Sequence, residues 1–84
     1  MSEKELTQEE VYKRAANLDQ KTKTLLYDDA CLMLRDMSIT EFINAEVTHH
    51  GEYVDEPKPV LRQAATNAAA NAVEMMAEEG TFMD

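Results

Sequence analysis

The 84-residue sequence contains few residues that interrupt helices, because it has only two glycines and two prolines. It has no tryptophan, three tyrosines and two phenylalanines. A folded core must therefore be built mainly from Leu, Val, Ile, Met and Ala. The single cysteine, Cys31, excludes an internal disulfide. Because Cys31 lies in an apolar helical run, we expect its thiol to be buried and unreactive.

The sequence also lacks targeting and catalytic signatures. No apolar run is long enough to span a membrane, and the charged N-terminus has no apolar signal-peptide segment. These absences and the isolated cysteine predict a soluble, cytoplasmic protein. The motifs GxSxG, GxGxxG, HExxH and the P-loop are missing, and there are only two serines. We therefore expect neither an enzyme nor a bound cofactor.

Acidic residues dominate the second part of the chain. The net charge is −9, from 17 acids and 8 bases. Residues 36–84 hold ten acids and two bases, a net charge of −8, whereas residues 1–35 have a net charge of −1. Such a surface repels phosphate backbones, which argues against direct binding of nucleic acid. It favours a partner protein with a basic surface, although the charge could equally serve solubility alone.

The longest predicted helix covers residues 59–80. Pro59 suits a first helical turn, Gly80 suits a C-terminal cap, and seven alanines lie between them. One face of this helix repeats at spacings of four and three residues, and it consists of Leu61, Ala65, Ala68, Ala72 and Met75. We interpret this seam as a self-association interface, most simply of a dimer. The same face could instead be the core of a single chain.

Three shorter helices are expected before the long one. Thr7 with Glu10, and Ser38 with Glu41, form two capping boxes, each ahead of a periodic apolar run. The helices are predicted over residues 8–18, over residues 20–36 with a break before Asp19, and from residue 38 to a stop at Gly51. The fold class is therefore a small all-α bundle of three to four helices.

The chain is predicted to form one domain, residues 1–84. Residues 1–6 are expected to be a frayed lead-in, residues 51–58 a connector, and residues 81–84 a tail. In the connector, Tyr53 and Val54 are expected to tuck onto the bundle or to add a short strand. In the second helix, Leu25 and Leu32 widen an apolar stripe that contains Leu26 and Ala30. So broad an apolar face is typical of a helix in the middle of a bundle.

Six acids form the predicted partner-binding surface, since no base intervenes among them: Asp36, Glu41, Glu46, Glu52, Asp55 and Glu56. The leading hypothesis is a protein-interaction module, a regulator or inhibitor that acts by occupying a basic surface. An alternative is a mimic of nucleic acid that inhibits a DNA- or RNA-binding protein.

A second alternative is a small-ligand or metal binder that uses His49, His50 and nearby acids such as Glu52. Adjacent histidines on a helix diverge, so their spacing does not favour a specific metal site, and none is predicted. His50 continues the apolar face formed by Ile43 and Val47, which favours a partly buried structural histidine. Asp28 and Asp29 also diverge as helical neighbours, so no shared-proton pair is expected between them.

Overall fold

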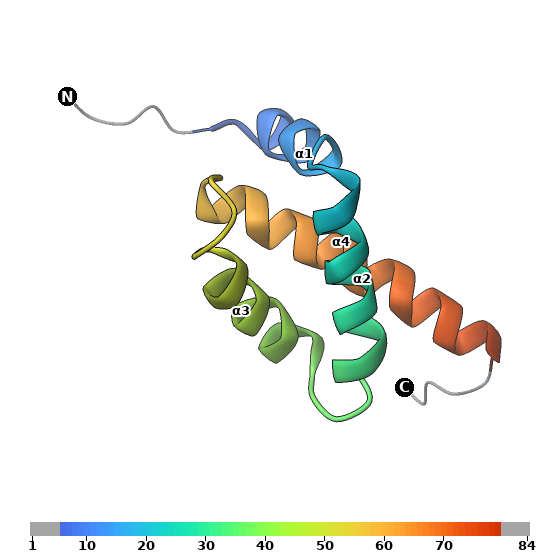
Figure 1. The fold of residues 1–84 in the computed structure, drawn as a ribbon. Helices are drawn as coiled ribbons and strands as arrows, with labels where there is room; N and C mark the ends of the chain where they lie inside the picture. Colours follow the sequence, from blue (N-terminus) through green and yellow to red (C-terminus); the bar gives the residue numbers. More distant parts are fainter. Residues whose placement is uncertain (1–5, 80–84) are drawn as a thin grey trace.

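The computed structural model describes residues 6–79, which form four helices and no strand. In chain order these are α1 (Gln8–Ala16), α2 (Gln20–Met33), α3 (Ile39–His50) and α4 (Lys58–Glu79) (Figure 1). The prediction of a small all-α bundle with a long alanine-rich last helix is confirmed. None of the four described helices is long and apolar enough to cross a membrane.

Local capping interactions explain where α1 and α3 begin. The Thr7 hydroxyl accepts a hydrogen bond from the Glu10 N–H at 3.1 Å, and Ser38 does the same for Glu41 at 3.2 Å. In return, each glutamate accepts a hydrogen bond from the N–H of its capping residue. Both predicted capping boxes are therefore confirmed. They satisfy N–H groups that a helix start would otherwise leave without partners.

The predicted helix boundaries are close but not identical to those observed. The break before Asp19 is confirmed, and α1 and α2 each end two or three residues earlier than expected. Gly51 follows α3 as expected, in a right-handed conformation. A Cβ there would lie 2.7 Å from the carbonyl oxygen of Val47, which explains a glycine at this position. The cap predicted at Gly80 and the tail at 81–84 lie outside the described residues.

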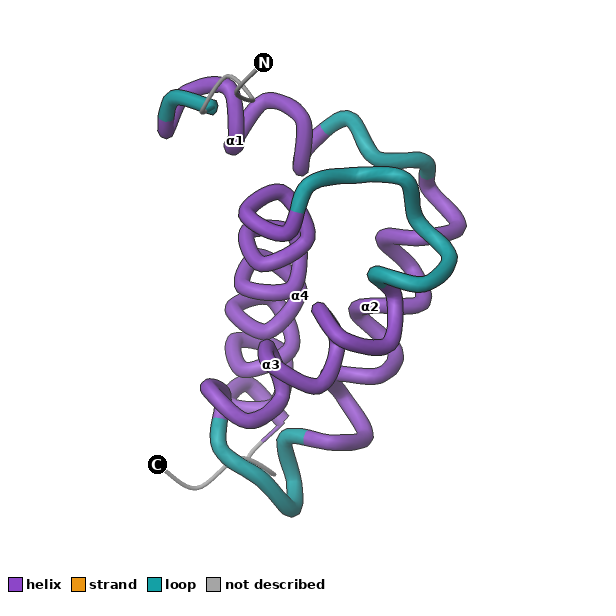
Figure 2. Tube along the Cα trace, turned by 90° about the vertical axis from the view of Figure 1, so that its left-hand side faces the viewer, coloured by secondary structure: helices purple, strands orange, loops and turns teal. Residues whose placement is uncertain are grey.

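Helix α4 is the centre of the bundle. The other three helices pack mainly on α4, while α2 and α3 make little contact with each other. Figure 2 shows α4 with α1 across one end and with α2 and α3 along its length. The alanines of α4 allow this close approach, since a small side chain keeps helix axes near each other. Its buried residues are Val60, Leu61, Ala64, Ala65, Ala68, Ala69, Ala72 and Met76.

The core has two parts that share α4. One joins Phe42 of α3 and Ala30 of α2 to Ala65 and Met76 of α4. The other joins Ala15 and Leu26, from α1 and α2, to α4. Phe42 is fully buried and is the largest side chain in the core. The small helix α1 therefore docks on one part of α4, and α3 docks on the other.

Three expectations about apolar residues are wrong, at least in part. Helix α2 does not lie in the middle of the bundle, because Leu25 and Leu32 are 45% and 70% exposed. Its neighbours Leu26 and Ala30 are buried against α4, so α2 is a peripheral helix with apolar residues on two sides. Tyr53 is 73% exposed and lies in a turn rather than a strand, whereas the neighbouring Val54 is half-buried. Cys31 is a free cysteine and is half-buried, not buried as expected.

Candidate functional site

Three titratable side chains meet where α2 faces α3. Asp29 comes from α2, and Glu46 and His50 come from α3, one helical turn apart. The Nε2 atom of His50 lies 3.2 Å from Oε1 of Glu46 and 3.7 Å from Oδ2 of Asp29. One ligand atom of each residue lies within 4.8 Å of the other two. We call this group the Asp29–Glu46–His50 cluster.

The cluster is largely removed from solvent. Glu46 is 4% exposed and His50 is 7% exposed, whereas the side chain of Asp29 is 35% exposed and forms the rim. The helical spacing explains the burial, because Glu46 and His50 follow Phe42 on the face of α3 that packs inward. Asp29 precedes the fully buried Ala30, so it sits at the border of the α2 contact face.

Two atoms of the cluster lack hydrogen bonds. Neither Glu46 Oε1 nor His50 Nε2 has a hydrogen-bond partner among the described residues, although each atom is fully buried. The 3.2 Å approach between them is close enough for charge interaction. Buried polar atoms without partners are uncommon in folded proteins and carry a free-energy cost of about 1–3 kcal/mol each.

Burial also changes the protonation of Glu46. Removal from water, a hydrogen bond with Asp29 and the negative charge of Asp29 together raise the pKa of the Glu46 carboxyl to about 8, and removal from water is the largest cause. Two carboxylates cannot both remain ionised so close together in a poorly solvated place unless a positive charge compensates them. At neutral pH the cluster therefore holds a proton on Glu46.

The predicted acidic surface is divided by the fold. Asp36 and Glu41 lie at the start of α3, while Glu52, Asp55 and Glu56 follow its end. Glu46, between the two groups, is buried and does not belong to the surface. Glu41 also caps α3, and Glu56 accepts a hydrogen bond from Arg14 at 2.8 Å. The surface is therefore two separate acidic groups at opposite ends of α3.

The predicted self-association seam is mostly occupied by the chain's own helices. Four of its five residues are buried within one chain, at 0–7% exposure, namely Leu61, Ala65, Ala68 and Ala72, and the fifth, Met75, is half-buried. Association of two chains through this seam remains a prediction. It would require α1, α2 or α3 to leave α4.

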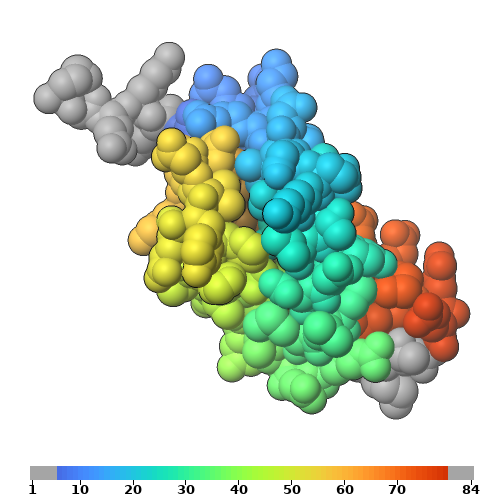
Figure 3. Space-filling model, viewed as in Figure 1, coloured from blue at the N-terminus to red at the C-terminus, as the bar shows by residue number. Residues whose placement is uncertain are grey.

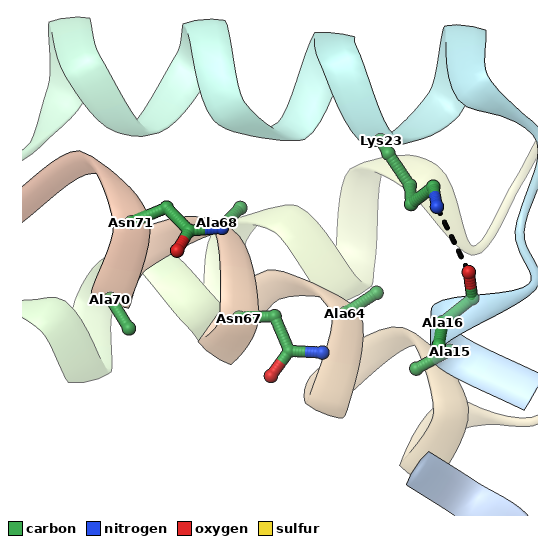
Figure 4. Close-up of a pocket in the computed structure, with 8 residues that line it drawn as sticks. All are labelled: Ala15, Ala16, Lys23, Ala64, Asn67, Ala68, Ala70 and Asn71. Atoms are coloured by element: carbon green, nitrogen blue, oxygen red, sulfur yellow. Dashed lines mark hydrogen bonds between the residues drawn. The ribbon is translucent and has the colours of Figure 1, made fainter. Parts of the chain in front are cut away.

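A shallow hollow of about 400 Å³ lies beside the seam, between α1, α2 and α4. Figure 4 shows its alanine lining, with the Asn67 and Asn71 amides along one side. The Lys23 ammonium donates a hydrogen bond to the carbonyl oxygen of Ala16 at 2.9 Å. This hydrogen bond links α2 to α1. Asn67 and Asn71 are exposed.

Sequence reasoning found one member of the cluster and missed two. His50 is buried, as its position after Ile43 and Val47 indicates. Its neighbour His49 is exposed and packs edge-on against the rings of His50 and Tyr53. Glu46 and His50 are four residues apart, which places them on the same inward face of the helix. This spacing is the signal in the sequence that could have predicted their proximity. Nothing in the sequence pattern indicates that Asp29 of α2 would lie opposite them.

In comparisons with known proteins, no family model matches the chain, and neither a curated protein nor a solved structure gives a significant match.

Proposed function

We propose that the chain is a small protein-interaction module that binds a basic partner protein on the outer face of α2. One observation carries this proposal. Leu25 and Leu32 are exposed and lie seven residues apart, so both point from the same side of the helix. Figure 3 shows α2 on the viewer's side of the molecule, next to α3.

The two leucines supply the apolar contact. Complete burial of a leucine side chain stabilises a complex by about 1.5–3 kcal/mol. Leu25 and Leu32 are already partly covered, so their contribution is smaller, about 1–2 kcal/mol each. Scattered exposed leucines are common, but these two lie two helical turns apart on one side of α2, where one apolar ridge of a partner could contact both.

Net charge selects the partner. Around the leucines the charges are mixed, since Asp28 and Asp36 are exposed together with Lys21 and Arg35. The whole chain nevertheless carries a charge of −9, which attracts a basic protein over distances longer than a contact and speeds association. Binding would then act by occupying a surface, without a chemical step.

Capture experiments with matched variants test this proposal. The purified chain, and a Leu25→Ser, Leu32→Ser double variant, would be used to capture proteins from a cell extract. The control is Tyr53→Ser, which removes a large side chain about as exposed as Leu32 from a turn outside α2. We expect the wild type and the control to retain the same basic protein and the double variant to lose it. Equal capture by all three would contradict the proposal.

Salt and concentration separate the other possibilities. A complex with an apolar contact persists in high salt, whereas a mimic of nucleic acid would lose its partner steeply as salt increases. The remaining occupant of the α2 face is a second copy of the chain. Light scattering over a range of concentration would then give a dimer for the wild type and a monomer for the double leucine variant.

A further inference from the structure

The Asp29–Glu46–His50 cluster has the composition of a metal site. It offers one imidazole nitrogen and two carboxylate oxygens from two helices. Imidazole together with carboxylate is typical of zinc and other divalent transition ions, whereas magnesium and calcium prefer oxygen ligands alone. The chemistry of the three donors therefore favours a transition ion.

The two separations from His50 Nε2 are close to those between ligands that share one ion. Ligand atoms bound about 2.0–2.2 Å from one zinc ion lie about 3–3.6 Å from one another at tetrahedral or octahedral angles. The separations from His50 Nε2 are 3.2 Å to Glu46 and 3.7 Å to Asp29. Glu46 and His50 are four residues apart on α3, the spacing with which a helix presents two ligands to one ion.

The unpartnered atoms give an independent argument. Glu46 Oε1 and His50 Nε2 are buried, have no hydrogen-bond partner among the described residues, and are both directed into the cluster. A cation between them would satisfy both atoms and would displace the proton that Glu46 otherwise holds at neutral pH. Asp29, partly exposed, leaves a path for an ion to enter and a position for water in its coordination shell.

We propose that Asp29, Glu46 and His50 bind one divalent transition-metal ion, Zn²⁺ being the best matched. The ion would join α2 to α3, two helices that otherwise make little contact with each other. Binding to the folded chain alone would stabilise it by an amount that grows with the logarithm of the free metal concentration divided by the Kd. Asp29 lies about one helical turn from both Leu25 and Leu32, so this site adjoins the proposed partner surface on α2, although metal binding itself can be tested without any partner.

Calorimetric titration of the full chain with Zn²⁺, after removal of metal by a chelator, tests the proposal. We expect one saturable site per chain. The variants Asp29→Asn and Glu46→Gln should weaken binding at least about tenfold, since even residues that only support metal ligands contribute tenfold or more. The matched controls are Asp28→Asn and His49→Gln, which change the neighbouring exposed residues. They should bind within about twofold of the wild type.

A second measurement does not depend on variants that fold. The imidazole resonances of His50, observed by NMR in the wild-type chain, should shift on addition of one equivalent of Zn²⁺, while those of His49 should not. Absence of saturable binding would overturn the proposal, as would a shift of His49 alone. Equal competition by Mg²⁺ would also overturn it, because that result would exclude the imidazole ligand.

Discussion

Arg14 of α1 donates a hydrogen bond to Glu56 across 42 residues of sequence, with 2.8 Å between guanidinium nitrogen and carboxylate oxygen. The pair connects the first helix to the segment that precedes α4. It also neutralises one of the acids that the sequence assigns to the partner-binding surface. The side chains are 44% and 24% exposed, so water and salt screen the attraction.

Removing this pair should have a small effect on stability. We expect Arg14→Gln to lower the free energy of unfolding by less than about 1 kcal/mol, because exposed ion pairs contribute little. A double-mutant cycle with Glu56→Gln in urea measures the coupling between the two residues. The coupling should decrease further in high salt. A coupling above about 2 kcal/mol would show that α1 depends on the pair for its position.

Loss of a capping hydroxyl should lower the free energy of unfolding more than loss of the Arg14–Glu56 pair does. Ser38→Ala removes the acceptor for the Glu41 N–H at the start of α3, and such changes cost about 0.5–2 kcal/mol. The control is Thr40→Ala, two residues later and exposed, which leaves the cap intact. Urea unfolding of the two variants checks the prediction. If both variants lost the same stability, the cap would not be the cause.

Enlarging a buried alanine of α4 should destabilise the fold. Ala65 of α4 is fully buried against the neighbouring helices. Ala65→Leu should therefore lower the free energy of unfolding by about 1–3 kcal/mol, because the larger side chain overpacks the core. Ala70→Leu is the matched control on the exposed side of the same helix. Thermal melts would show a lower Tm for the first variant and little change for the second. The reverse order would place the alanine seam outside the core.

The stability of the metal-free chain should fall as pH rises between about 4.5 and 8. The pKa of Glu46 is raised from an ordinary value of 4.5 to about 8, so the folded chain retains a proton that the unfolded chain releases. The contribution of Glu46 to stability is complete below its pKa in the unfolded chain. It is lost as the pH rises through its pKa in the folded chain. The loss is at most about 1.4 kcal/mol per pH unit.

A neutral side chain at position 46 should remove this dependence. We expect Glu46→Gln, measured with a chelator present, to be more stable than the wild type at pH 8 and to show a flatter profile from pH 5 to pH 8. Glu52→Gln, at an exposed position, should retain the wild-type slope. Asp29 from α2 and His50 from α3 face the same carboxyl, so both are kept unchanged in this comparison. A wild-type slope in Glu46→Gln would exclude Glu46 as its source.

Local signals in the sequence were sufficient for the helices but not for the cluster. Capping boxes at Thr7 and Ser38 act within four residues, so their outcome is decided by nearby chemistry. The apolar periodicity of α2 indicated that one side of this helix is buried, but it did not indicate which side. Leu25 and Leu26 are adjacent in sequence, and only the packing of α2 on α4 determines that Leu26 is the buried one. The seam of α4 was visible as a pattern. Whether it meets the same chain or another depends on how the other helices dock.

The position of Asp29 shows the same limit for the candidate site. Glu46 and His50 share a helical face that can be read from their spacing, whereas Asp29 joins them only because α2 and α3 both pack on α4. Tertiary arrangement of this kind is not encoded in a local pattern. The sequence places Glu46 on the acidic surface for the same reason, since only the packing of the helices puts it on the inner face of α3.

The central place of α4 has a consequence for the order of folding during synthesis. A ribosome releases α1, α2 and α3 before α4, yet these three helices have little to pack on until the last one appears. The nascent chain therefore carries apolar faces without a core until translation reaches the alanine-rich segment. A chain stopped before Lys58 would lack every alanine of α4 on which Phe42 and Leu26 depend, and we expect it to be a substrate for proteases.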